Sequence, residues 1–296
     1  MLNLILDSLR VEAAALGIDG DRLIQLAKAT LIEDLGGGVD ATSVATIPSD
    51  QISVANFVSR AVGVVAGVVV AKVVIAIACD GKVEFSQGVR EGARIQGGSL
   101  ILVARGNSQG LLLAERSALN FIGRLSGIAT LTSHWVAAVE GTGARVRDTR
   151  KTTPGLRDLE KFAVRMGGGT NHRLSLSDAA MIKDNHVLAA GGIKLAFESI
   201  RKKFPTLPIE VEVDRFEQIS EALGVGADLI LLDNMSVEEC FTAVQYVAGK
   251  ARLEASGRIT LDTARTYAQT GVDYLAIGAL THSAPILDIG LDLTVE

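Results

Sequence analysis

The sequence predicts an α/β fold in which short parallel strands alternate with helices, preceded by a separate α+β region. From about residue 142 onward, apolar runs rich in Val, Ile and Leu recur about every 20 to 35 residues, with an amphipathic helical stretch after each. This alternation is typical of parallel strands joined by right-handed crossovers, in a barrel or in an open doubly wound sheet. The first 115 residues lack the alternation, so we expect them to form a different layer.

Six strands and four helices are predicted in the alternating region. The strands are expected at 144–149, 179–184, 209–213, 228–234, 251–256 and 273–279. The helices are expected at 187–204, 216–223, 237–248 and 261–270. Each strand ends in polar residues, which is where the chemistry of a β/α barrel is located.

The first region is predicted to mix helices with strands of alternating polarity. We expect a helix at 21–34, a glycine-rich turn at 36–38, strands at 54–65 and 100–104, and turns within 88–98. A long helix at 111–135 is expected to link this region to the alternating one. The apolar stretch 61–78 contains Lys72, so we expect a buried strand followed by a buried helix and not a membrane span.

Composition excludes several classes of protein. The chain has 296 residues, of which 48% are hydrophobic and 21% charged, so it can bury a sizeable core in one or two domains. A net charge of −5 and only 4% aromatic residues argue against nucleic acid or a membrane surface as the main partner. The two cysteines form no disulfide framework, and Asp7 interrupts any signal-peptide pattern. These features predict a cytoplasmic location.

Polar side chains recur at the ends of the predicted strands, beyond what a purely structural barrel requires. Along the chain, cations follow the earlier predicted strands and carboxylates follow the later ones. The residues are Asp148, Arg150, Lys151, Lys183, Asp184, His186, Glu212, Asp214, Asp233, Asn234, Glu254, Ser256 and Gly278.

Positive charge is concentrated between residues 145 and 186. This segment holds nine Lys and Arg against five acids, so it carries +4 while the rest of the chain carries −9. We interpret Arg157, Lys161 and Arg165, at helical spacing, as a solvated helix face. The remaining strand-end cations, with His172 in the turn at 167–173, predict a pocket for a ligand with more than one anionic group. The cations concerned are Arg150, Lys151, Arg173 and Lys183.

Two late carboxylates, Glu212 and Asp233, are candidate ligands for Mg²⁺ held together with a phosphorylated substrate. The alternative is that these acids form salt bridges with the basic cluster. No HExxH or CxxC spacing points to zinc. Ser256–Gly257 and Gly278–Ala279 follow the last two strands, where barrels often hold a phosphate.

Three segments of the chain are highly specific: RDTRKTTPGLR (147–157), EKFAVRMGGGTNHR (160–173) and MIKDNH (181–186). They resemble the signature of the quinolinate phosphoribosyltransferases, also called carboxylating nicotinate-nucleotide pyrophosphorylases. Further matches in the same order are EDLGGGVDATS (33–43), ERSALNFIGRLSGIAT (115–130), EVEVD (210–214), LILLDN (229–234), EASG (254–257) and GVDYLAIGALTHS (271–283).

The resemblance implies a two-domain fold. An N-terminal α/β sandwich is expected over residues 1–118, and an open seven-stranded, TIM-like α/β barrel over 119–284, with the tail 285–296 returning to the first domain. The seventh strand is expected shortly before Arg145. The resemblance also implies a homodimer, or a larger assembly such as a hexamer, with Arg116 reaching the partner's active site.

The resemblance further implies a reaction of NAD biosynthesis. Quinolinate and phosphoribosyl pyrophosphate would give nicotinate mononucleotide, pyrophosphate and CO₂, with Mg²⁺ and no organic cofactor. The quinolinate ligands would be Arg116, Arg150, Lys151, His172, Arg173 and Lys183. Phosphoribosyl and phosphate ligands would be Lys151, Asn171, Ser256, Gly257, Gly278 and Ala279, and the catalytic residues Lys151, Lys183, Glu212 and Asp233. Arg258 departs from the small or polar residue expected after Ser-Gly.

Three alternatives remain. A paralogue associated with molybdenum transport shares the fold, although the intact RDTRKT and NHR segments favour the transferase. An aldolase using Lys183 as a Schiff base would need no phosphate donor. A non-catalytic sensor of phosphorylated metabolites would not need carboxylates such as Glu212 and Asp233 beside its cations.

Overall fold

The computed structural model describes residues 1–296, except for the side chain of Gln87. The chain forms two compact units. The first comprises residues 1–131, 158–167 and 284–296, and the second comprises 132–157 and 168–283. These units differ from the predicted division after residue 118, because 119–131 and 158–167 group with the first unit.

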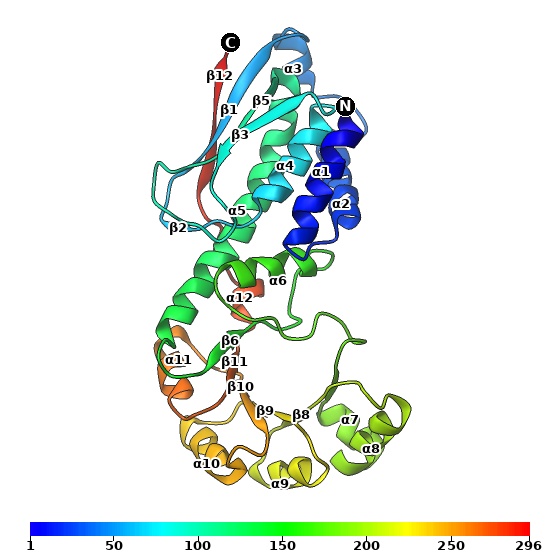
Figure 1. Ribbon diagram of the computed structural model, residues 1–296, viewed down its shortest axis with the longest axis vertical. Helices are drawn as coiled ribbons and strands as arrows, with labels where there is room; N and C mark the ends of the chain where they lie inside the picture. Colours follow the sequence, from blue (N-terminus) through cyan, green and yellow to red (C-terminus); the bar gives the residue numbers. More distant parts are fainter. The chain divides into compact units, whose positions relative to one another are not determined.

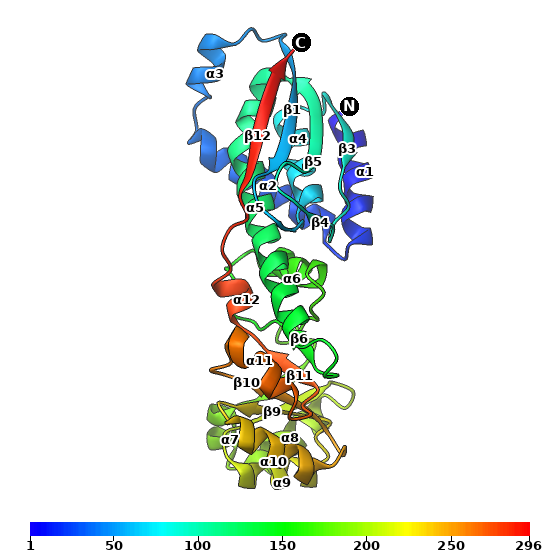
Figure 2. The same cartoon turned by 90° about the vertical axis from the view of Figure 1, so that its left-hand side faces the viewer.

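The first unit is built on an antiparallel four-stranded sheet with the order β12-β1-β5-β3. Buried and part-exposed residues alternate along β1, as expected for a strand with one covered face. The C-terminal strand β12 lies beside β1 in Figure 2, with Ser53 paired to Val295. The strands are β1 (Ile52–Ser59), β3 (Val83–Gly88), β5 (Leu100–Asn107) and β12 (Ile289–Val295), with β2 (Gly63–Val64) and β4 (Arg94–Ile95) as a small separate ribbon.

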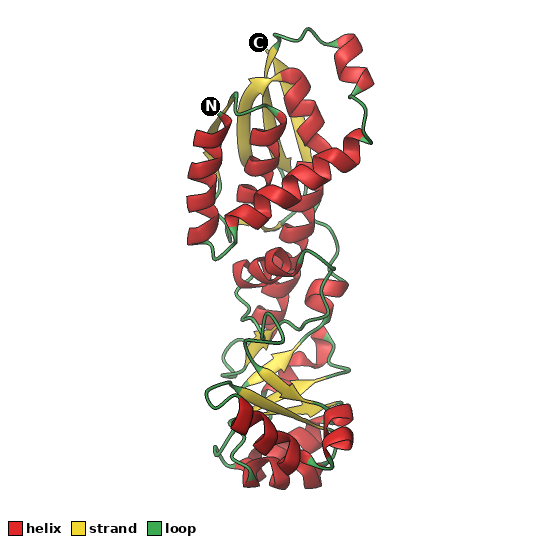
Figure 3. Cartoon of the chain, turned by 90° about the vertical axis from the view of Figure 1, so that its right-hand side faces the viewer, coloured by secondary structure: helices red, strands yellow, loops and turns green.

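Helix α4 (Val68–Ala78) packs against β3 and β5, and α1 (Leu2–Ala15) and α2 (Gly20–Leu35) pack against α4, so these helices lie on one side of the sheet (Figure 3). The other helices of the unit are α3 (Ala41–Thr46), α5 (Ser108–Ala138) and α6 (Arg157–Met166). The predicted helix at 21–34 is confirmed as α2, which Asp19 caps at its start and the left-handed Gly36 ends. The predicted buried strand and helix within 61–78 are confirmed as β2 and α4, where Lys72 pairs with Glu12 at 2.8 Å. Among the described residues, no helix is long and apolar enough to cross a membrane.

One prediction about the first unit is wrong. Helix α6 does not present a solvated basic face, because Lys161 is completely buried. Leu159 and Phe162 to Val164 are also buried, so the helix is covered on most sides. Arg165 donates a hydrogen bond to the carbonyl of Leu16 at 2.7 Å.

The second unit is a curved parallel sheet with helices along its outer side (Figure 1). The six predicted strands are all present, in the order β6-β11-β10-β9-β8-β7. They are β6 (Arg145–Arg147), β7 (Ala180–Ile182), β8 (Ile209–Val213), β9 (Leu229–Asp233), β10 (Arg252–Ser256) and β11 (Tyr274–Ala276). The helices are α7 (Asp184–Ala190), α8 (Ile193–Lys203), α9 (Phe216–Gly224), α10 (Val237–Val247), α11 (Leu261–Ala268) and α12 (Ala279–His282).

The seventh strand is not where the prediction placed it. In the described chain no strand lies between α5 and β6, because α5 continues to Ala138 and the following turn contains Gly141 and Gly143 at positive φ. Instead, Thr170 forms an isolated parallel bridge with Arg147 of β6. The α/β barrel class is confirmed, but the expected strand before Arg145 is absent from the described chain, and a single-residue bridge at Thr170 lies beside β6 instead.

Candidate active site

A pocket of about 410 Å³ opens at the carboxyl ends of the strands of the second unit. Every strand, or the turn that follows it, contributes to its wall. The lining residues are Thr149, Arg150, Lys151, His172, Arg173, Met181, Lys183, Glu212, Leu231, Asp233, Ser256 and Ala276. The structure therefore brings together eight of the residues that the sequence singled out.

Four cations meet in this pocket: Arg150, Lys151, Arg173 and Lys183. Burial lowers the pKa of Arg173, and the positive charge of Arg150 lowers it further. The opposing influence of Glu210 is smaller. Cations that repel one another in a half-buried pocket favour an anionic ligand, which relieves the repulsion.

Lys183 is held at the start of helix α7, and its ammonium group pairs with Glu212. The salt-bridge alternative considered for the late carboxylates therefore describes Glu212. Asp233 accepts a hydrogen bond from the side chain of Asn234 at 2.7 Å and also lines the pocket. The donor set of two carboxylates beside the pocket fits Mg²⁺, which prefers one or two carboxylates together with phosphate oxygens.

The main chain of Lys151 is held by helix α12, which follows strand β11. The hydroxyl of Thr281 donates to the carbonyl of Lys151 at 2.8 Å. A Cβ atom at Gly278 would lie 3.2 Å from the side chain of Lys151 and 3.2 Å from the ring of His282. Gly278 therefore allows the lysine to pass close to the backbone. Ala279, which begins α12, does not line the pocket among the described residues.

The turn after β10 has an unusual backbone. Gly257 has φ of 84° and Arg258 has φ of 55°, both left-handed. A Cβ atom at Gly257 would collide with the side-chain oxygen of Asn234. The backbone N–H of Asn234 donates to the carbonyl of Ser256 at 2.8 Å. Ser256 lines the pocket, while Gly257 shapes the turn that carries it.

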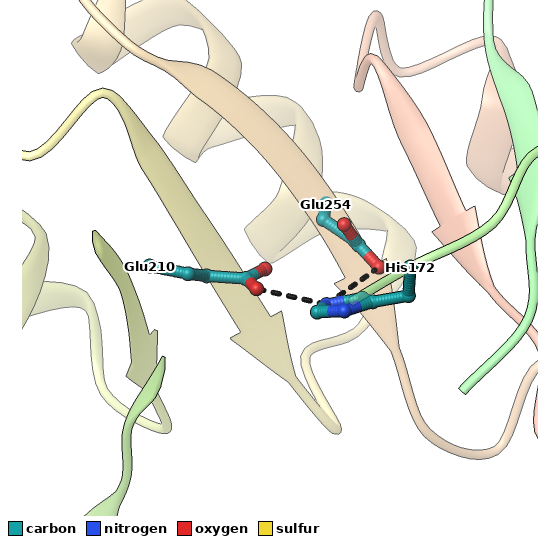
Figure 4. A group of neighbouring side chains, drawn as sticks. All are labelled: His172, Glu210 and Glu254. Carbon is teal, nitrogen blue, oxygen red and sulfur yellow. Dashed lines mark ion pairs between the residues drawn. The ribbon is translucent and has the colours of Figure 1, made fainter. Parts of the chain in front are cut away.

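His172 is buried, and both of its ring nitrogens face protein groups. Nδ1 accepts the backbone N–H of Arg173 at 2.7 Å. Nε2 lies 2.8 Å from Oε2 of Glu210 and 3.8 Å from Oε1 of Glu254 (Figure 4). Since Nδ1 is an acceptor, the proton of the neutral ring is on Nε2. This geometry makes His172 a support for Arg173.

The same tautomer decides whether His172, Glu210 and Glu254 can hold a metal ion. Their ligand atoms lie within 4.8 Å of one another. A metal would need the lone pair of Nε2, but that nitrogen carries the proton while Nδ1 accepts from Arg173. The three side chains are therefore better described as a buried cluster of a histidine and two carboxylates than as a metal centre.

Two family models match the chain. Residues 40–126 match the quinolinate phosphoribosyl transferase N-terminal domain, and residues 128–292 match the C-terminal domain of the same family. The chain belongs to the quinolinate phosphoribosyl transferase family. The resemblance inferred from the sequence is confirmed.

Relatives within the quinolinate phosphoribosyl transferase family cover nearly all of the chain. A nicotinate-nucleotide pyrophosphorylase [carboxylating] of Mycobacterium leprae is 51% identical over 268 residues, which are 89% of this chain and 94% of the relative. The solved structure of NadC from Streptococcus pyogenes is 40% identical with a TM-score of 0.87, covering 92% of this chain and 96% of that one. The nicotinate-nucleotide pyrophosphorylase of Francisella tularensis is 35% identical with a TM-score of 0.87, covering 93% and 96%.

Sequence reasoning did not reveal that charged side chains next to this pocket are buried and paired with one another. Glu254 is fully buried and forms an ion pair with Arg147. Burial and the neighbouring Glu210 raise the pKa of Glu254 to about 7, against the opposing effect of Arg147. Glu210 could have been found from Glu212, because residues two apart in a strand face the same side.

Asp148 is a second buried residue whose role the sequence did not reveal. Its carboxylate accepts the backbone N–H of His172 at 2.8 Å and the side-chain amide of Asn171. It thereby connects the segment that carries Arg150 to the segment that carries Arg173. Asn171, predicted as a phosphate ligand, does not line the site pocket among the described residues and instead borders a separate cavity.

Arg116 is the predicted site residue that belongs to the first unit. It lies exposed on α5 and does not line this pocket in the described chain. Its assignment to the active site of a partner subunit stays a prediction.

Proposed function

We propose that this chain transfers the phosphoribosyl group of phosphoribosyl pyrophosphate to quinolinate and releases pyrophosphate and CO₂, forming nicotinate mononucleotide. The observation that carries the proposal is the meeting of four cations and two carboxylates around one pocket at the strand ends. The names of the relatives agree, since they include nicotinate-nucleotide pyrophosphorylases [carboxylating] and quinolinate phosphoribosyltransferases [decarboxylating].

The two carboxylates of quinolinate would bind Arg150, Arg173 and Lys183. The planar guanidinium groups match a carboxylate with two parallel hydrogen bonds, and the ammonium adds a point charge. Arg173 is well placed for this because its backbone N–H is held by His172 and one guanidinium nitrogen donates to the carbonyl of Ala179 at 2.8 Å. A dianion bound here would offset the repulsion between Arg173 and Arg150.

The phosphoribosyl donor would lie between Lys151 and the carboxylate side of the pocket. Glu212 and Asp233 would hold Mg²⁺, which would neutralise charge on the departing pyrophosphate. Lys151 supplies a further positive charge, and Ser256 offers a hydroxyl to the 5′-phosphate. Two polyanionic substrates can share the pocket only because these charges reduce their mutual repulsion.

The chemistry needs positioning and electrostatic stabilisation more than a protein nucleophile. The quinolinate nitrogen forms a bond to C1 of the ribose while the bond from C1 to the pyrophosphate oxygen breaks. The pyrophosphate carries away the electron pair of that bond. The adjacent carboxylate then leaves as CO₂, and the electron pair it leaves behind is stabilised by the pyridinium nitrogen until the carbon takes a proton.

Several finer features belong to the same proposal. The enzyme would act as a homodimer, or as a hexamer assembled from such dimers, with Arg116 completing the site of the partner. Its net charge of −5 and its lack of a disulfide framework suit the cytoplasm.

One assay tests the proposed reaction. The protein is incubated with quinolinate, phosphoribosyl pyrophosphate and Mg²⁺, and CO₂ and nicotinate mononucleotide are measured. Formation of both products in equal amounts is expected. Binding of quinolinate without turnover would favour the sensor alternative, and trapping of Lys183 by borohydride with a carbonyl substrate would favour the aldolase alternative.

A further inference from the structure

Four turns at the carboxyl edge of the parallel sheet use the same capping arrangement. In each, the side chain of the third helical residue accepts the N–H of the residue that precedes the helix. The pairs are Lys183 with His186 at 3.1 Å, Arg215 with Gln218 at 3.1 Å, Ser236 with Glu239 at 2.7 Å, and Thr260 with Thr263 at 3.0 Å. The turn after β7 differs from the others because its acceptor is an imidazole.

This turn is also the one that carries a pocket residue. Of the four residues that precede these helices, Lys183 alone lines the site pocket in the described part of the chain. His186 holds both sides of Lys183, since Nδ1 accepts the lysine N–H and the His186 N–H donates to the lysine carbonyl at 2.8 Å. The imidazole therefore fixes the backbone from which the Lys183 ammonium reaches Glu212 and the pocket.

Apart from the buried Ile182 and the N–H of Val187, which donates to the carbonyl of Lys183 at 2.9 Å, packing adds little to hold the turn in place. Helix α7 has seven residues and buries none of its side chains. Strand β7 has three residues and pairs on one side only, with β8. Because packing contributes so little here, the cap has a larger share in positioning Lys183 than caps have in well-packed helices.

We propose that His186 is a positioning residue for Lys183, and that protonation of its imidazole releases Lys183 from the position in which it binds the substrate carboxylate. The proposal rests on the role of Lys183 given under the proposed function. Under this proposal, quinolinate binds more weakly at acidic pH.

The physical reason is the donor and acceptor inventory of the ring. Neutral imidazole offers Nδ1 as an acceptor, whereas the protonated ring has two N–H donors and no acceptor. The N–H of Lys183 would then face another N–H. His186 is exposed, so it exchanges protons with solvent directly. The charged groups of this turn are Lys183 and Asp184, and the neighbouring hollow is also lined by Glu212, Asp214, Arg215 and Asp233.

Two substitutions separate the pH effect from loss of structure. His186→Gln keeps an acceptor at the third helical position, as Gln218 does in the next turn, but cannot be protonated in this range. His186→Ala removes the acceptor. The control, Gln218→Ala, removes the equivalent cap from Arg215, which does not line the site pocket.

The measurement is kcat/KM for quinolinate between about pH 5.5 and 8.5, where histidine changes its charge. We expect kcat/KM of the wild type to fall on acidification by a factor about fivefold larger than in His186→Gln. This size is expected because protonation removes one helix cap in the wild type only. At every pH, His186→Ala should have a kcat/KM as low as that of the acidified wild type. It should show no additional fall in kcat/KM on acidification. Gln218→Ala should follow the wild-type profile. Any pH effect of Glu254 is common to all four proteins and cancels in the comparison.

A His186→Gln profile identical to that of the wild type would overturn the proposal, as would full activity of His186→Ala across the range. Thermal unfolding of each variant checks that all are folded at the assay temperature. Failure of the proposed function has a different signature, because the wild type would then form no nicotinate mononucleotide at any pH.

Discussion

Two layers of charge lie one above the other inside the second unit, and they are organised differently. We call Arg150, Arg173 and Lys183 the clamp, and Arg147, His172, Glu210 and Glu254 the buried layer. Clamp residues line the pocket, whereas in the buried layer Glu254 pairs with Arg147 and Glu210 lies 2.8 Å from His172. The charges of the buried layer are therefore paired with one another, whereas the clamp gathers three cations around one pocket, where only Lys183 has a carboxylate partner in Glu212 among the ion pairs described.

The largest effect should come from the clamp itself. Arg173→Ala should weaken quinolinate binding by about a hundredfold or more, because it removes hydrogen bonds between charged groups worth several kcal/mol in total. Isothermal titration calorimetry with quinolinate measures this directly. Arg173→Lys keeps the charge but loses the planar fork, so it should recover only part of the affinity.

Arg252→Ala is the matched control, since this exposed arginine begins β10, pairs with the hydroxyl of Tyr274 and does not line the pocket in the described chain. Near-normal affinity of Arg173→Ala would remove the arginine from the clamp. The clamp would then have no demonstrated role in binding quinolinate.

The second effect concerns stability and tests the buried layer. Glu254→Ala leaves Arg147 without its partner carboxylate and should lower the free energy of unfolding by about 3 kcal/mol, as loss of one partner of a buried pair does. Urea denaturation measures the change. A loss below about 0.5 kcal/mol, the range of surface substitutions, would show that the layer is not a structural support.

The pH dependence of that stability has a definite sign. The pKa of Glu254 is raised from 4.5 to about 7, so the folded protein keeps a proton that the unfolded chain releases. Stability should therefore fall as pH rises through this window and level off above it. Glu254→Gln should flatten this slope between about pH 5 and pH 8. An unchanged slope in the variant would assign the titration to another group.

The two layers also differ in how far the sequence predicted them. Arg150, Arg173 and Lys183 follow short apolar strands, and the carboxyl ends of parallel strands meet at one edge, so their convergence could be expected. Glu254 and Lys161 could not be recognised as buried, because the sequence pattern treats a charged residue as solvated unless its partner is known. For Glu254 that partner is Arg147, which is distant in sequence.

The seventh strand was misplaced for a similar reason. Apolar periodicity marks strands of several residues, whereas the bridge at Thr170 consists of a single residue after three glycines. The tautomer of His172 depends on a backbone N–H that no sequence pattern reveals. Local pattern thus predicted the elements and the strand-end cations, while the pairing of charges needed the three-dimensional structure.

A smaller effect is expected at the phosphate side of the pocket. Gly257→Ala should destabilise the turn by about 1 to 3 kcal/mol, because alanine is strained at φ of 84° and its Cβ would collide with Asn234. We also expect a higher KM for phosphoribosyl pyrophosphate, since the turn carries Ser256. Gly226→Ala is a matched control with φ of 78° and open space around the added atom. Equal effects of the two substitutions would mean that the collision with Asn234 is relieved without cost.

The smallest effect should come from Arg258, the residue that departs from the family pattern next to that turn. Its φ of 55° disfavours any residue with a Cβ, so Arg258→Gly should raise the free energy of unfolding by about 0.5 kcal/mol after the extra entropy of the unfolded chain is subtracted. Ala248→Gly provides the control, with φ of 47° at the end of α10. If both variants gain stability but only Arg258→Gly raises the KM for phosphoribosyl pyrophosphate, the arginine is kept in a strained conformation for its charge. If neither KM changes, the strain at Arg258 serves the turn alone, and the phosphate side of the pocket depends on Ser256 and Lys151.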